Sequence, residues 1–200
     1  MMRTSISLCA LFLLFLMAAC SKKEQGLQTL FLSDQLRQML PYGNGQTVRF
    51  TNGQGATIEA AVNVKRGTTK KSACATCDAY VYEEFMEVNM TVGGKPFVNM
   101  SVDSRPIVFL SIFSPEDNYQ IGAGFDFATI EGTSQPSCNA PRQMCFDSLA
   151  IGGSSTFNRV LEISNGVSNS SSQLTRAYYT VNRGLIGFAY GNGITYRLLQ

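Results

Sequence analysis

Apolar and polar residues alternate in short runs from Gly45 to the end of the chain, with glycine-rich turns between the runs. A period of two is typical of strands that bury one face. The longest run covers residues 79–92, and it places one set of side chains on a single face: Tyr80, Tyr82, Glu84, Met86, Val88, Met90 and Val92. The other predicted strands cover residues 47–50, 57–64, 97–102, 107–113, 122–129, 146–151, 156–163, 176–181, 185–190 and 194–199. About ten short strands in a meander predict a mainly β fold, with an antiparallel sandwich or barrel-like sheet.

One short helix is predicted before these strands begin. Leu36, Met39 and Leu40 are spaced as on one face of a helix, and Ser33 is a suitable N-cap. Pro41 ends the helix, because proline lacks an N–H donor and disfavours helical backbone in the residue before it. We therefore expect one N-terminal helix followed by strands.

The first twenty residues follow a third pattern, with a basic start, a short apolar run and small residues at its end. Arg3 is the only charged residue in this stretch, and the apolar run extends from residue 6 to residue 18. This organisation is typical of a secretory signal peptide. The run is shorter than the roughly 20 residues that a membrane-spanning helix needs.

Residues 16–20, Leu-Met-Ala-Ala-Cys, resemble the lipobox of bacterial lipoproteins, in which signal peptidase II cuts just before a lipidated cysteine. The resemblance implies that residues 1–19 are a signal peptide and that Cys20 carries acyl chains. Residues 20–29 are then a polar tether, and residues 30–200 form a single β-rich domain that is held at a membrane.

Composition narrows the classes of function. The chain has 200 residues and a formal net charge of +2, so it lacks the basic surface expected of a nucleic-acid-binding protein. It contains no histidine, which excludes a His-dependent catalytic triad. No glycine-rich nucleotide-binding motif occurs either. We therefore expect a protein that is not an enzyme and that uses no cofactor or metal.

Four cysteines remain for the domain: Cys74, Cys77, Cys138 and Cys145. In an exported protein an even number of cysteines indicates disulfides. Local pairing, of Cys74 with Cys77 and of Cys138 with Cys145, forms most easily and is our first expectation. A cross-pair such as Cys74–Cys145 closes a longer loop and would stabilise the folded domain more. A four-cysteine zinc site is an alternative. The Cys-x-x-Cys spacing of the first pair also occurs in redox motifs, although the alternating residues after it indicate a strand.

Glu84 is the one candidate for a ligand anchor or functional acid. The alternation places its carboxylate on the apolar face of residues 79–92, where burial disfavours the charged form unless a partner is present. The alternative is a structural role, with Glu84 at a sheet edge or paired with an arginine. Glu83 and Glu87 are expected on the opposite, solvated face.

The layout of the whole chain is similar to that of small envelope lipoproteins of unknown function from Gram-negative gut-type bacteria. The similar segments are residues 40–42, 74–82 and 178–196. In such lipoproteins an Asp after the lipidated cysteine signals retention in the inner membrane, so Ser21 implies the outer membrane. Lys22-Lys23 departs from the acidic residues that favour surface export. The resemblance thus implies a periplasm-facing position, with surface exposure as the alternative.

Two hypotheses of function follow from these patterns. The first is a non-enzymatic, lipid-anchored domain that binds or scaffolds an envelope protein. The second is a carrier or receptor for an apolar ligand, with a lipocalin-like or lipoprotein-carrier-like sheet. A ligand-sized apolar cavity inside the sheet would favour the carrier, whereas a filled core and exposed apolar residues would favour the binding domain.

Overall fold

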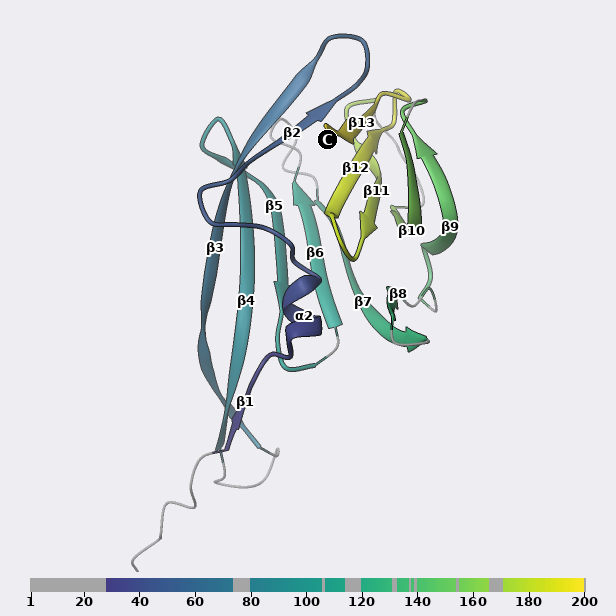
Figure 1. Cartoon of the computed structure of the whole chain (residues 1–200). Coiled ribbons are helices and arrows are strands. Elements are labelled where there is room, and N and C mark those ends of the chain that lie inside the picture. Colours follow the sequence, from purple (N-terminus) through teal and green to yellow (C-terminus); the bar gives the residue numbers. More distant parts are fainter. Residues whose placement is uncertain are drawn as a thin grey trace, which may run out of the picture.

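A computed structural model describes residues 28–73, 80–105, 107–113, 120–130, 133–136, 138, 140–153, 155–165 and 171–199. The fold is mainly β, as the alternation predicted, and its antiparallel strands form a curled half-barrel sheet (Figure 1). The helix α2 (Asp34–Gln38) is the short N-terminal helix that was expected. The described residues contain no helix long and apolar enough to cross a membrane.

The strands are β1 (Thr29–Leu30), β2 (Thr47–Thr51), β3 (Thr57–Ser72), β4 (Tyr80–Val92), β5 (Lys95–Val102), β6 (Ile107–Phe113), β7 (Gln120–Ile130), β8 (Thr133–Pro136), β9 (Gln143–Ile151), β10 (Ser155–Ser164), β11 (Leu174–Thr180), β12 (Gly184–Tyr190) and β13 (Thr195–Leu198). Strand β3 continues eight residues beyond its predicted end, because its charged second half pairs with β4 as far as Ser72 opposite Tyr80. Strand β8 was not predicted.

The sheet is a meander that runs outward and then returns. Strands β2 to β8 follow one another in space, whereas β9 to β13 approach from the other side, and β13 pairs with β2. The two ends of the strand order are therefore β8 and β9, which are neighbours in the sequence. The curl brings β7 and β8 against β10 and β11 (Figure 1).

The inner face of this curl holds the main hydrophobic core. Phe50, Phe97 and Phe188 pack against one another with ring centroids 5.2–6.2 Å apart, and they come from β2, β5 and β12. Phe125 on β7 packs against Tyr179 on β11 at 5.0 Å. These rings are almost completely buried, so aromatic side chains fill the space between the two arms of the sheet.

A second, smaller cluster lies on the other face of β11 and β12. Its buried residues are Ile151, Phe157, Val160, Tyr178, Ile186 and Ala189. Strand β12 is therefore buried on both faces, which explains its nearly continuous apolar sequence. Strand β9 approaches β13 across this cluster, so the last five strands form a small roll of their own.

The N-terminal segment closes one side of the main core. Leu36, Met39 and Leu40 are buried there, and Ser33 caps α2 by accepting a hydrogen bond from Leu36 N at 3.2 Å. Ahead of α2, β1 pairs in parallel with the beginning of β4, with Leu30 opposite Glu83. The chain thus enters the domain beside an interior strand of the sheet.

Candidate functional site

The cysteines separate into two groups. Cys20, Cys74 and Cys77 lie outside the described residues. Cys138 and Cys145 form a disulfide with their Cα atoms 5.8 Å apart, which is the local pairing expected for these two residues. Because both sulfurs belong to this bond, neither can pair with Cys74 or Cys77 or serve as a thiolate in a four-cysteine zinc site. The disulfide joins the ends of the sheet, since it follows β8 and lies on β9.

Glu84 lies on the inner face of β4, as the alternation predicted, and it is paired. Both carboxylate oxygens accept hydrogen bonds from Arg37 Nη2, at 3.0 and 3.1 Å, and one accepts from Leu32 N at 2.9 Å. The Leu32 bond, and after it Arg37, lower the pKa of Glu84 against the opposing effect of burial. Glu84 thus fixes the N-terminal segment to the sheet, which is the structural alternative.

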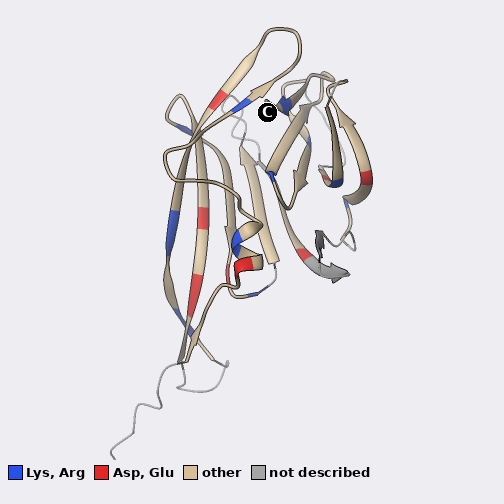
Figure 2. Cartoon of the chain, viewed as in Figure 1, with Lys and Arg blue, Asp and Glu red and all other residues tan. Residues whose placement is uncertain are grey.

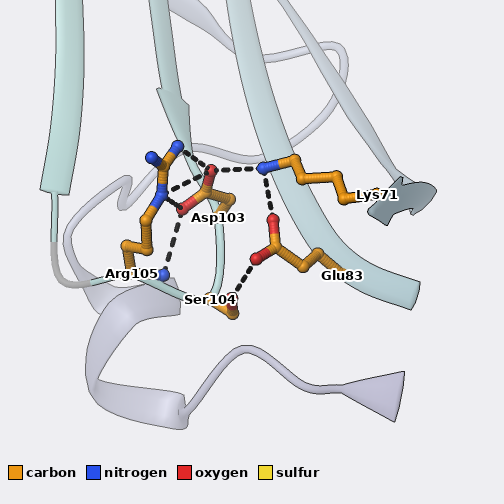
Figure 3. Close-up of polar contacts among 5 residues, drawn as sticks. All are labelled: Lys71, Glu83, Asp103, Ser104 and Arg105. Atoms are coloured by element: carbon orange, nitrogen blue, oxygen red, sulfur yellow. Dashed lines mark hydrogen bonds and ion pairs between the residues drawn. The ribbon is translucent and has the colours of Figure 1, made fainter. Parts of the chain in front are cut away.

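The expectation that Glu83 is solvated was wrong. Its side chain is only 11% exposed, because the turn after β5 folds over the outer face of β4. There Glu83 is ion-paired with Lys71 of β3 and accepts a hydrogen bond from Ser104 Oγ at 3.1 Å. Figure 3 shows that this contact belongs to a cluster of five residues, Lys71, Glu83, Asp103, Ser104 and Arg105.

Asp103 is the centre of this cluster. Its carboxylate accepts hydrogen bonds from Lys71 Nζ at 3.1 Å and from Arg105 Nη2 at 2.6 Å. Burial alone would raise the pKa of Asp103, but the bonds from Arg105 and Lys71 outweigh it and lower the pKa to about 2. Two acids and two bases satisfy one another here (Figure 3), so the cluster is a structural clasp between β3, β4 and the turn after β5.

The strands β3 to β6 present an outer face that points away from the main core. In its centre Asn99 Nδ2 donates to Glu87 Oε1 and to Asn89 Oδ1, both at 2.8 Å. Glu87 therefore lies on the outer face as expected, but within a hydrogen-bonded network. Figure 2 shows basic residues of β3 next to acidic residues of β4.

Two aromatic side chains flank this polar network on the outer face. Phe85 lies opposite Gly67, and Phe109 lies opposite Gly124. A Cβ atom on either glycine would approach the aromatic ring to 3.1 Å, so the rings pack directly over bare backbone. Phe109 is nevertheless 42% exposed. The outer face thus combines exposed aromatic surface with amide and carboxylate groups.

A cleft of about 580 Å³ lies at the open end of the roll formed by β9 to β13. Tyr178 and Ala189, which belong to the second cluster, are among its lining residues. Glu162 projects into it with a side chain that is 11% exposed, and Arg176 Nε lies 3.7 Å from Glu162 Oε1. We call this cavity the β9–β13 cleft.

The residues of this cleft were not singled out from the sequence. The strands that carry Glu162, Arg176 and Tyr178 were predicted, but a long Ser/Asn-rich connection separates them. A short turn would set the register of the two strands, but here none joins them. The pairing of Glu162 with Tyr178 therefore cannot be predicted from the sequence. An acidic residue among the apolar residues 160–163 was the available signal.

Among the residues that the structure describes, no group of three or more His, Cys, Asp or Glu side chains is arranged to hold a metal ion. Comparisons of the chain with protein-family models, with curated proteins and with solved structures find no match.

Proposed function

We propose that the protein is a lipid-anchored domain of the bacterial cell envelope that binds another envelope protein and has no catalytic role. The anchor is Cys20, in the lipobox-like residues 16–20, and the proposed location is the periplasmic side of the outer membrane. Acyl chains on one cysteine supply the two or more hydrophobic signals that stable membrane attachment requires.

The observation that carries the binding role is the contrast between the two faces of the sheet. The inner face is filled by Phe50, Phe97 and Phe188, whereas Phe109 is exposed on the outer face. Exposed aromatic residues beside hydrogen-bonding groups are typical of the anchor residues and rims of protein interfaces. The outer face of β3 to β6 is the proposed contact surface.

The same contrast counts against the carrier hypothesis. A lipocalin-like carrier keeps ligand-sized apolar space inside its sheet. Here the corresponding space is occupied by the aromatic core and by Leu36, Met39 and Leu40 of the N-terminal segment. An apolar ligand would have to displace these side chains.

The anchor is tested by expressing the chain and its Cys20→Ala variant in a Gram-negative host. The parent protein should fractionate with the outer membrane, incorporate labelled palmitate and begin at a lipidated Cys20 in mass spectrometry. The variant should lose the label. A parent chain that keeps residues 1–19 and takes up no label would refute the anchor.

The protein-binding role is tested by crosslinking in intact cells, followed by purification of the protein in detergent. We expect one envelope protein in stoichiometric amount, and we expect Phe109→Ser to abolish its capture. Ile194→Ser is the matched control, because Ile194 is similarly exposed but follows β12, away from the outer face. Equal capture by both variants would exclude the outer face as the contact surface.

A further inference from the structure

The β9–β13 cleft has the construction of a ligand site, and the outer face and the anchor play no part in it. Two rows of cross-strand neighbours line it. Met144, Glu162 and Tyr178 form one row, because Glu162 lies opposite Met144 in β9 and opposite Tyr178 in β11. The second row includes Arg176 opposite Ala189 and Ala189 opposite Thr195. The walls are therefore held by paired strands.

The lining and the volume of the cleft suit a small molecule. Tyr178 and Ala189 belong both to the second hydrophobic cluster and to the lining, so the cleft borders that cluster. Its volume of about 580 Å³ lies within the range of roughly 300–1,000 Å³ that is usual for small-molecule sites. Most of its accessible lining is polar, which suits a ligand that forms hydrogen bonds.

Glu162 is the group that points to a ligand. Its side chain is nine-tenths buried, yet the guanidinium of Arg176 approaches it only to 3.7 Å, which is too long for a hydrogen bond. Arg176 is instead hydrogen-bonded to the Tyr178 hydroxyl. The Glu162 carboxylate thus has an ion-pair partner but no close donor, so its oxygens can accept hydrogen bonds from water or from a bound molecule.

The charges of the lining indicate a neutral ligand. Glu162 and Arg176 are the charged residues that line the cleft, and their charges cancel. Further polar groups, among them those of Ser164, Asn165 and Thr195, include both donors and acceptors. Met144 and Tyr190 add apolar and aromatic surface at the walls.

From this arrangement we infer that the β9–β13 cleft binds a neutral, polyhydroxylated molecule, such as a sugar unit of a glycan. The hydroxyl groups of a sugar can donate to Glu162 and accept from Arg176, while its C–H face packs against Met144 or Tyr190. In a protein without tryptophan, a tyrosine is the larger of the aromatic residues available for such packing.

The test uses the full chain in a detergent without a sugar head group. Saturation-transfer difference NMR is recorded with three sets of probes: neutral di- and trisaccharides, uronic acids, and free amino acids. We expect a neutral saccharide to bind and Glu162→Gln to weaken that binding tenfold or more, because a hydrogen bond to a charged acceptor is lost. Thr195→Val should weaken it less.

Glu59→Gln is the matched control. Glu59 is also an ion-paired glutamate on a strand, 2.8 Å from Arg49 Nε, but it lies on β3 outside the cleft. Its substitution should leave saccharide binding unchanged, and the unfolding midpoints of all variants show that they are folded. The inference is overturned if no neutral saccharide binds at millimolar concentration, if only the charged probes bind, or if Glu162→Gln and Glu59→Gln bind equally.

Discussion

Gly184 begins β12 at the point where the N-terminal segment meets the sheet, and replacing it with alanine should destabilise the protein strongly. Its backbone has φ = +70°, which is unfavourable for alanine by roughly 1–2 kcal/mol. A Cβ at this position would also lie 2.5 Å from Tyr42 Cζ and 2.6 Å from Tyr42 Cε2. Tyr42 is buried, so the added Cβ would force its ring out of its packed position.

Displacing Tyr42 has a further cost that can be estimated from its hydrogen bonds. Its hydroxyl accepts from Leu185 N at 2.7 Å and donates to Arg183 O at 3.3 Å. Leaving the buried Leu185 N–H without an acceptor costs about 1–3 kcal/mol. Together with the backbone term, Gly184→Ala should lower the free energy of unfolding by about 2–5 kcal/mol.

Urea-induced unfolding of the full chain measures this loss, and Gly193→Ala is the control. Gly193 has a similar φ of +84°, but a Cβ added there would meet no atom within 4 Å, so its substitution should cost only the roughly 1–2 kcal/mol of the backbone term. In a Tyr42→Leu background, which removes the ring, Gly184→Ala should cost no more than Gly193→Ala. Equal losses for the two glycine substitutions in the parent chain would refute the role of Tyr42.

Three further predictions concern the polar contacts and the disulfide. The folded pKa of Asp103 lies below its ordinary 3.8, so its contribution to stability is present above pH 4 and is lost as pH falls towards 2. The free energy of unfolding, measured in urea at pH 5 and pH 2.5, should therefore differ less between the two pH values in Asp103→Asn than in the parent chain, by on the order of 1 kcal/mol. Arg37→Ala should accelerate amide exchange of Leu32, whose N–H is bonded to Glu84, while the Val88 amide in the middle of β4 keeps its rate. Acceleration at both positions would argue against a local role for the Arg37–Glu84 pair. Replacing Cys138 and Cys145 by serine opens a short loop and should lower the free energy of unfolding by about 2.5 kcal/mol, and an unchanged urea midpoint would contradict the pairing.

The parts of the fold that follow from local pattern could be predicted from the sequence. Alternation was sufficient to place Glu84 and Met86 on the inner face of β4, and Ser33 and Pro41 were sufficient to delimit α2. The second half of β3 was missed because its lysines and threonines form no apolar stripe, although the partner strand β4 supplies the pairing.

The parts that depend on distant contacts could not be predicted. Glu83 is buried by Ser104 and Asp103, which reach it only because the turn after β5 folds back over β4. Likewise the β9–β13 cleft depends on the curl of the last five strands, and no local spacing encodes that curl.

The place where the chain enters the domain has a mechanical consequence. In the proposed anchored form, any pull between the membrane and a bound partner reaches the domain through β1. Because β1 runs parallel to β4, a pull along it loads the β1–β4 hydrogen bonds, and beyond them the Glu84 contacts with Leu32 and Arg37, in shear. The load then passes to β4 and its long pairing with β3, far from the junction of β8 and β9. Tension is thus shared between the β1–β4 pairing and the Glu84 contacts, and it does not peel β8 or β9 from the ends of the strand order.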